Sequence, residues 1–166
     1  MKQLGTFMII ISLVALTSCN SNGTKPTSEI QSADAFEAFA EHFSETASFA
    51  YANVSNYKVL LVSQETFGND ENDDKEAIEA TIFALDSKGK ILSLGSIRSQ
   101  GTLYPVSILN GKLMVAGHQF VRIYSIRGDL PELVLDSCQE GDGPELTEMF
   151  DTFEQGVSVK FRKRLK

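Results

Sequence analysis

Thiol chemistry in this sequence would depend on two cysteines, Cys19 and Cys138. A nucleophilic cysteine needs a lowered pKa and a nearby base, and only His42 and His118 could supply an imidazole. Neither histidine lies in a motif with Cys138, which closely follows the apolar stretch 133–135. We therefore interpret Cys138 as a half-buried small hydrophobic side chain, not as a catalytic nucleophile.

Oxygen ligands for a cation are concentrated in one acidic segment. Asp70, Asn72 and Asp74 have the spacing with which an EF-hand loop begins. That motif needs glycine at its sixth position and glutamate at its twelfth, where this chain has Lys75 and Thr81. Asp70, Asn72 and Asp74 remain candidates for a looser cation site. The alternative is a solvated hairpin loop that charge repulsion holds open. The sequence predicts no cofactor.

The charge balance restricts the classes of partner. The chain has 22 acidic and 15 basic residues, a net charge of −7, which argues against nucleic-acid binding. Residues 140–154 contain no basic residue, and residues 160–166 contain no acidic one. The two segments could pair across a turn, or the basic segment could protect an edge strand. A third possibility is that basic side chains bind a partner or a lipid headgroup; the candidates are Lys160, Arg162, Lys163 and Arg164.

The N-terminal residues predict export. Lys2 precedes an apolar run, residues 7–16, that is too short to span a bilayer as a helix. The run ends in Leu16-Thr17-Ser18-Cys19, which resembles the lipobox of bacterial lipoproteins. The resemblance implies cleavage between Ser18 and Cys19 and acylation of the Cys19 thiol, with palmitate a typical added chain. A plain signal peptide or a buried apolar segment is the alternative.

Processing at a lipobox would leave 148 of the 166 residues and, without Lys2, a net charge of −8 instead of −7. Two or three acyl chains would hold the protein on a membrane, because each buried methylene contributes about 0.8 kcal/mol. Asn20 follows the cysteine, whereas in enteric-type sorting an aspartate there retains a lipoprotein in the inner membrane. The resemblance therefore implies the outer membrane more than the inner one, with the protein in the cell envelope.

The chain divides into a signal peptide (1–18), a lipidated cysteine with a flexible tether (19–32) and a single domain (33–166). The domain is predicted to be α+β and mostly β. Its one N-terminal amphipathic helix, residues 33–47, carries Phe36, Phe39 and Phe43 at helical spacing. The helix start has two candidate caps, and a run of short strands and one further helix follows it. The cap is Ser32 or Asp34, the strands are at 57–64, 78–85, 91–97, 103–109, 112–116, 120–126, 133–135 and 157–165, and the further helix is at 144–153.

Three local patterns refine these strands. Residues 120–126 alternate, with Phe120, Arg122, Tyr124 and Ile126 on one face and Val121, Ile123 and Ser125 on the other. In the last strand Val157, Val159 and Phe161 are expected to point inward. Asn110-Gly111 predicts a two-residue type I′ turn.

Short strands at this spacing predict an antiparallel sheet or meander: a small sandwich, an open barrel or a partial propeller, with the helix packed on it. The stretch from Ala84-Leu85-Asp86 through Tyr104-Pro105-Val106 and Asn110-Gly111-Lys112 to Tyr124 resembles a PQQ-type β-propeller blade. The blade's usual tryptophan is absent and no second copy follows. The resemblance therefore implies a local four-stranded meander over residues 78–126 and no quinone cofactor.

These observations favour a non-catalytic binding module. The sequence has no serine-hydrolase, zinc-protease, Walker or dinucleotide-binding motif. A lipid-anchored β domain would present its loops to an envelope protein or a glycan. The alternative is a hydrolase of glycans or cell wall that uses paired carboxylates, because acidic residues are abundant.

Overall fold

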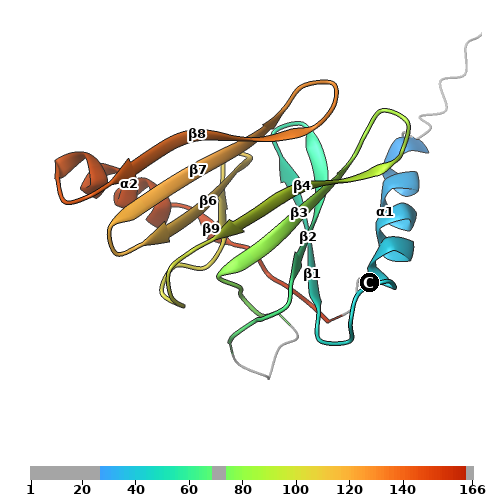
Figure 1. The fold of residues 1–166 in the computed structure, drawn as a ribbon, viewed down its shortest axis with the longest axis horizontal. Coiled ribbons are helices and arrows are strands. Elements are labelled where there is room, and N and C mark those ends of the chain that lie inside the picture. Colours follow the sequence, from blue (N-terminus) through green and yellow to red (C-terminus); the bar gives the residue numbers. More distant parts are fainter. Residues whose placement is uncertain (1–26, 69–73, 164–166) are drawn as a thin grey trace, which may run out of the picture.

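A computed structural model describes residues 27–68 and 74–163, with the backbone alone for 27–32 (Figure 1). Two helices and nine strands lie in this part of the chain. Their bounds are α1 Thr27–Ala40, β1 Ser48–Val54, β2 Tyr57–Ser63, β3 Glu79–Leu85, β4 Ile91–Arg98, β5 Ser107–Leu109, β6 Lys112–Gly117, β7 Phe120–Arg127, β8 Glu132–Glu140, α2 Pro144–Glu154 and β9 Val157–Ser158.

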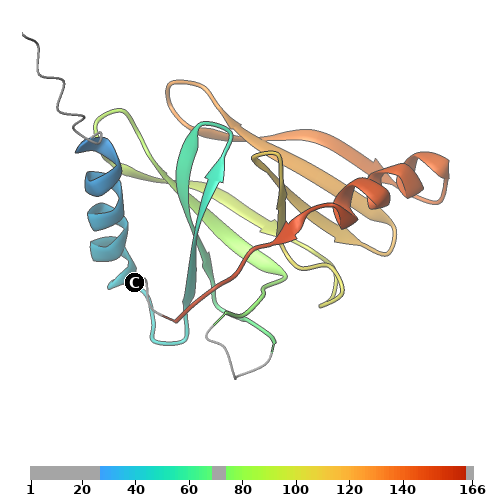
Figure 2. The ribbon, with the colours of Figure 1, turned by 180° about the vertical axis from the view of Figure 1, so that it is seen from behind.

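The strands form two antiparallel sheets. Sheet 1 has the order β1-β2-β3-β4 and sheet 2 the order β8-β7-β6-β5-β9 (Figures 1 and 2). Within residues 27–68 and 74–163 no strand pairing joins β4 to β8, so the sheets do not close into a barrel. The prediction of a mostly β, antiparallel α+β fold is confirmed.

The middle of sheet 1, at β2, is apolar on both faces. Along β2, Val59 and Leu61 point into a cluster shared with sheet 2, and Leu60 and Val62 point into a cluster shared with α1. All four side chains are at most 4% exposed. Successive strand residues point to opposite faces, so an uninterrupted apolar run is what a strand covered on both sides requires.

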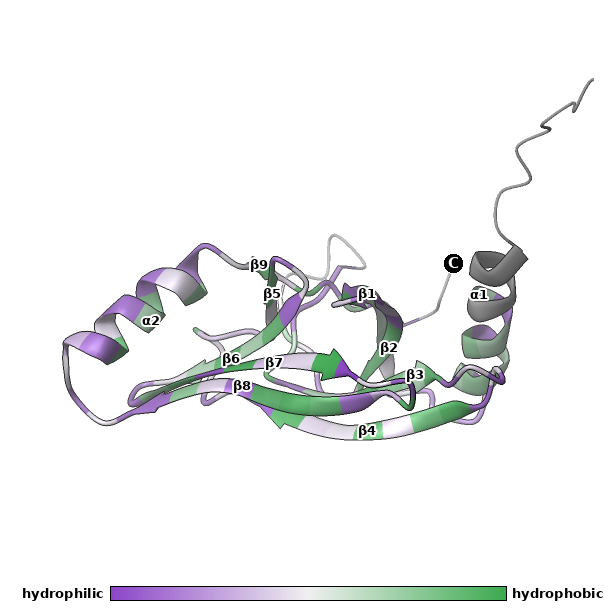
Figure 3. Ribbon diagram, turned by 90° about the horizontal axis from the view of Figure 1, so that it is seen from above, coloured by the Kyte–Doolittle hydropathy of each residue, from purple (hydrophilic) through white to green (hydrophobic). Residues whose placement is uncertain are grey.

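Sheet 2 repeats this arrangement with the other helix. On β7, Tyr124 and Ile126 face the cluster between the sheets, whereas Val121 and Ile123 face α2. This alternation is the one predicted from the sequence of residues 120–126. Each helix thus covers the outer face of its own sheet, and Figure 3 shows α1 and α2 at opposite ends of the molecule.

Helix α1 begins at Thr27 and ends at Ala40, seven residues earlier than predicted, so Asp34 lies inside it and does not cap it. A tighter turn follows the helix, in which His42 N donates to the Phe39 carbonyl three residues earlier, at 3.1 Å. The His42 imidazole also bonds the Ala38 carbonyl at 3.1 Å, which satisfies a free group at the helix end. Neither described helix is long and apolar enough to cross a bilayer.

The predicted phenylalanine stripe does pack on sheet 1. The Phe39 ring lies 4.9 Å from the Phe83 ring, and the Phe43 ring lies 5.9 Å from the Phe49 ring, centroid to centroid. Phe36 is fully buried and contacts Tyr51 at 6.1 Å. The aromatic contacts therefore continue past the helix end, and the turn after α1 stays on the sheet.

Three predictions about strands were wrong. Strand β1 was not predicted, because its inner face is made of small residues such as Ala50 and Ala52. Strand β8 extends to Glu140 instead of ending at Leu135, because an exposed edge strand tolerates polar residues. The C-terminal strand is limited to β9, and Val157, predicted to point inward, is 72% exposed.

The blade-like stretch does not form one meander. Its first two strands, β3 and β4, belong to sheet 1, and β5, β6 and β7 belong to sheet 2. The predicted turn at Asn110-Gly111 is confirmed, since both residues have positive φ, 50° and 71°, as a type I′ turn requires. The local turn chemistry was thus predictable, but the change of sheet between β4 and β5 was not.

We expect Phe36→Ala to lower the free energy of unfolding by about 3–5 kcal/mol, because it leaves a cavity under α1. Urea denaturation followed by circular dichroism would measure the change. The matched control is Leu103→Ala, whose side chain is 78% exposed and whose effect should stay within about 0.5 kcal/mol. Equal stability of Phe36→Ala and the control would contradict the packing of α1 on sheet 1.

Candidate functional site

The basic C-terminal residues bind the acidic segment that was the candidate cation loop. Arg162 Nε donates to Asp74 Oδ1 at 2.5 Å, and Lys160 Nζ donates to Glu76 Oε1 at 2.5 Å. Ser158 Oγ donates to the same Glu76 oxygen at 2.6 Å. Two separately predicted sites, a cation loop and a basic partner-binding segment, are therefore partly paired with each other.

This pairing changes what the acidic residues can do. The Arg162 hydrogen bond lowers the pKa of Asp74, and the bonds from Lys160 and then Ser158 lower the pKa of Glu76. A carboxylate that already forms an ion pair with a guanidinium attracts a metal cation less strongly. Among the residues that the structure describes, no three His, Cys, Asp or Glu side chains gather as metal ligands would.

Other predicted site residues lie outside the described ranges: Ser18, Cys19, Asp70, Asn72 and Arg164. Lys163 Nζ donates to the Thr46 carbonyl at 2.6 Å. Of the acidic residues 140–154, Glu140 pairs with Arg122 of the neighbouring strand β7, whereas Lys160 and Arg162 pair with Glu76 and Asp74. Partner binding by the basic segment stays a prediction, in which the partner would compete with these internal contacts.

The C-terminal segment, residues 157–163, joins the two sheets. Val159 N bonds the Val106 carbonyl at 2.9 Å next to β5, and Phe161 exchanges two backbone bonds with Lys75. Arg162 exchanges two more with Phe49 of β1. Phe161 is fully buried, so this segment also contributes to the core between the sheets.

Cys138 is an exposed free thiol on β8, not the half-buried residue predicted. Its Sγ lies 3.6 Å from Glu140 Oε1, beside Arg122. The two imidazoles are bonded elsewhere, His42 to the helix end and His118 to Tyr104 Oη at 3.5 Å. The structure brings no imidazole base to this thiol among the described hydrogen bonds.

A cluster of aromatic side chains lies where α2 meets the end of sheet 2. The Tyr104 ring lies 5.7 Å from His118, 5.8 Å from Phe150 and 6.2 Å from Phe153. Leu103, beside it, is 78% exposed. We call Leu103, Tyr104, His118 and Phe150 the Tyr104 patch; Phe153 is buried beneath it.

Local sequence explains how His118 reaches this patch. Gly117 precedes it, and a Cβ atom at Gly117 would lie 2.4 Å from Phe120 Cε1 and 2.7 Å from Gln100 Cβ. Only glycine therefore fits between these side chains, and the β6–β7 turn packs closely against the loop before Tyr104. Leu103, Tyr104 and His118 come from residues 99–111 and 113–121, which contain no Asp, Glu, Lys or Arg, whereas Phe150 comes from the acidic helix α2.

Sequence reasoning missed the patch because Tyr104 was assigned to a strand and Phe150 to a separate helix. The signal that was present is the pair Leu103-Tyr104 in a turn-forming stretch before Pro105. Loops are usually polar, so a large apolar residue exposed in one is informative.

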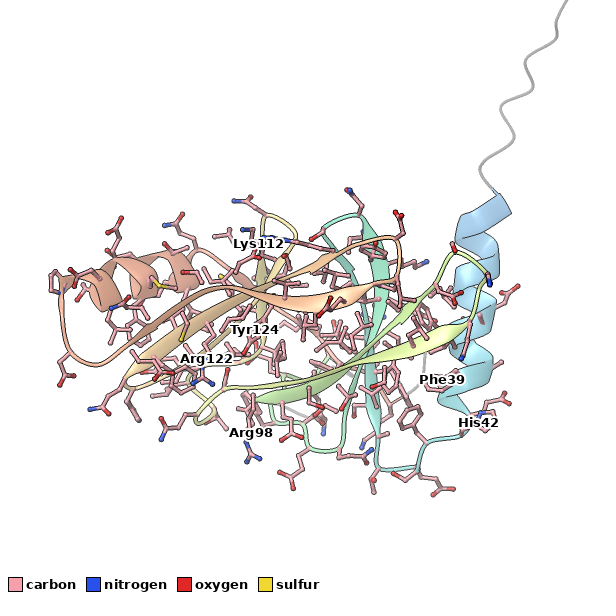
Figure 4. The ribbon with its side chains drawn as sticks, turned by 45° about the horizontal axis from the view of Figure 1, so that its top comes forward. Phe39, His42, Arg98, Lys112, Arg122 and Tyr124 are labelled. Carbon is pink, nitrogen blue, oxygen red and sulfur yellow. The ribbon has the colours of Figure 1, made fainter. Side chains whose placement is uncertain are left out.

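A shallow hollow of about 160 Å³ lies on the outer face of sheet 1. Glu65 and Glu79 are two carboxylates on its wall, and Arg98 lies 3.1 Å from Glu79 as an ion pair. Figure 4 shows Arg98 directed outward from β4. Both members of the pair are exposed, with side chains 69% and 50% accessible. The remaining wall residues are Ser63, Gln64 and Ile78.

Comparisons with known proteins found no matching family model, no matching curated protein and no matching solved structure. The function must therefore be argued from the residues and their geometry.

Glu76 gives the structure a defined acid dependence. Its folded-state pKa is below its ordinary value of 4.5, so its ionised form stabilises the fold above that pH. This stabilisation is lost as the pH falls through the lower, folded-state pKa. We expect Glu76→Gln to lower the free energy of unfolding at neutral pH by on the order of 1 kcal/mol.

The difference between Glu76→Gln and the original protein should shrink as the pH falls below about 4.5, because protonation then removes from the original protein the interaction that the variant already lacks. Thermal denaturation across this range would measure it. The control Glu45→Gln changes an exposed glutamate outside the network. A pH-independent difference at Glu76 would contradict the argument.

Proposed function

We propose that the protein is lipid-anchored in the bacterial envelope, with the outer membrane favoured, and acts as a non-catalytic binding module for a protein or glycan partner. The observation that carries the binding function is the Tyr104 patch. Within it Leu103 is 78% exposed and Tyr104 and Phe150 are part-exposed, and its loop and turn carry no charged residue on a chain that is otherwise strongly acidic. Such surfaces on folded domains mark contacts with other molecules.

The chemistry of the patch suits a contact surface. Tyrosine and phenylalanine supply large apolar area, and the Tyr104 hydroxyl and the His118 imidazole supply hydrogen bonds at the edge. Packing on Phe150 and the buried Phe153 holds the Tyr104 ring in place, so little conformational entropy is lost on binding.

The hydrolase alternative has weaker support. Glycoside hydrolysis uses two carboxyl groups, one of which must be kept protonated, usually by burial. The hollow on sheet 1 holds Glu65 and Glu79, but Glu79 is half exposed and forms an ion pair with Arg98, so it is not a buried carboxyl group. This geometry resembles a surface ion pair more than an acid catalyst.

The anchor is tested by Cys19→Ala in the full chain. We expect this variant to move from the membrane fraction to the soluble fraction of the envelope, because the acyl chains supply most of the membrane affinity. Cell fractionation with immunoblotting would measure the distribution. Cys138→Ala, the matched control at the other cysteine, should stay with the membrane, and retention of Cys19→Ala there would refute the lipobox.

The binding surface is tested by a photo-crosslinking amino acid at position 103 of the full, lipidated chain in the native host. We expect discrete higher-mass adducts from position 103 and none from position 130, which is similarly exposed at 67% against 78% but lies on another surface. Leu103→Asp should also abolish sedimentation with purified cell-wall glycan if the partner is a glycan. Absence of both effects would reject the Tyr104 patch as the contact surface.

A further inference from the structure

We propose that one surface of the domain, which we call the turn corner, lies against the lipid bilayer while the Tyr104 patch points away from it. The turn corner comprises the start of α1 and the four hairpin turns at residues 55–56, 86–90, 110–111 and 128–131. This inference rests on the proposed lipid anchor, and it adds an orientation that the anchor alone does not specify.

The start of α1 lies at the turn corner because α1 runs antiparallel to β1. Tyr51 Oη donates to the Ala33 carbonyl at 3.5 Å, and farther along the chain the Phe43 ring lies 5.9 Å from the Phe49 ring. Later residues in this part of the chain therefore lie beside earlier residues of β1, so the two segments run in opposite directions. Thr27 is therefore at the same end as Ser55, which follows β1.

The turns are joined to one another by hydrogen bonds. Ser55 N donates to the Gly111 carbonyl at 2.7 Å, and Ser55 Oγ accepts from Ile126 N at 3.3 Å. Tyr57 Oη donates to the Gly128 carbonyl. Three of the four turns, from both sheets, are thus joined, and Figures 1 and 2 both place the fourth, the β3–β4 turn, beside the start of α1.

The chain between Cys19 and Thr27 limits how far this surface can be from the membrane. Thr27 follows Cys19 by eight positions. Even a fully extended chain gains only about 3.5 Å per residue, so α1 starts within about 28 Å of the acylated sulfur. A tether this short keeps the end of the domain from which it leaves close to the lipid headgroups.

The exposed side chains of the turn corner suit a bilayer surface. Leu130 is 67% exposed at the tip of the β7–β8 turn, and Lys88 and Lys90 are exposed in the β3–β4 turn. Asp86 in that turn accepts the backbone N–H groups of both lysines, at 2.8 and 2.9 Å. Lysines can bind headgroup phosphates, and an exposed leucine can enter the interface between headgroups and acyl chains.

The opposite end of the molecule is unsuited to an anionic membrane. Helix α2 and the loop before it carry five acidic residues and no basic one: Asp142, Glu145, Glu148, Asp151 and Glu154. The turn corner is closer to balance, although Asp129 is exposed beside Leu130. Negative lipids would repel the α2 end, which bears the Tyr104 patch, and so favour the proposed orientation.

The test uses the absence of tryptophan from this chain. Leu130→Trp and Leu103→Trp each create a single fluorescent reporter at an exposed leucine, one at the turn corner and one in the Tyr104 patch. Each full, lipidated variant is placed in vesicles of phosphatidylethanolamine and phosphatidylglycerol, with or without brominated phosphatidylcholine. Interfacial side chains lie about 5–10 Å into the boundary between headgroups and acyl chains, so we expect bromine to quench Leu130→Trp emission by roughly half.

The Leu103→Trp emission should not change. Equal quenching of the two reporters, or quenching of Leu103→Trp alone, would overturn the orientation. Flotation of the same vesicles separates this result from the anchor. Protein that floats without quenching at position 130 rejects only the orientation, whereas protein that does not float rejects the proposed anchor and, with it, the orientation.

As a second test, Lys88→Glu with Lys90→Glu should reduce quenching at position 130, since both lysines would then repel phosphatidylglycerol. Lys160→Glu with Lys163→Glu, on the C-terminal segment, is the charge-matched control and should leave quenching unchanged. Circular dichroism of each variant checks that the fold persists. Unchanged quenching in the double variant would reject the lysine contacts with the headgroups.

Discussion

Burial of sheet 1 on both faces is the constraint on which the rest of this structure depends. One face packs on α1 and the other on sheet 2, so β2 has the apolar run Val59-Leu60-Leu61-Val62. Because the shared cluster needs both sheets, neither sheet has a complete core without the other. The positions of the turns, of α2 and of the Tyr104 patch all follow from this joint core. Ser55 illustrates the cost, since its φ of 53° is unfavourable for a residue other than glycine, and its two bonds to sheet 2 offset that strain.

Local patterns in the sequence predicted much of the fold. The alternation along residues 120–126, the turn at Asn110-Gly111 and the phenylalanines of the first helix all depend on neighbours a few positions apart, and the structure agrees with each. The assignment of strands to sheets depends on long-range packing, which such patterns do not contain. Strand β1 was missed because Ala50 and Ala52 are weak strand formers, and they fit there because the layer beneath them is already filled by larger side chains.

The candidate sites were harder to predict than the elements, for a related reason. The sequence showed which residues carry opposite charges. It did not show which of them pair, because the acidic residues nearest in sequence to the basic segment are not the ones that bind it in space. The basic residues after 160 lie next to the acidic residues 140–154 in sequence, yet they bind Asp74 and Glu76, which β9 and the residues after it bring close in space. The Tyr104 patch likewise combines a loop, a turn and a helix, and its exposed loop residue Leu103 was assigned to a strand from the sequence.

The long-range contacts of the C-terminal segment affect the order in which this chain can fold. Lys163 and Thr46 are 117 positions apart, and the backbone of residues 159–162 reaches β5, the acidic hairpin and β1. Those contacts form only after residues 159–163 have been synthesised. A protein exported through a narrow channel must remain unfolded until it has passed through, and late closure of the seam between the sheets would help it do so. Long-range pairing of this kind slows folding, so a chain exported as proposed would benefit from folding helpers on the far side of the membrane.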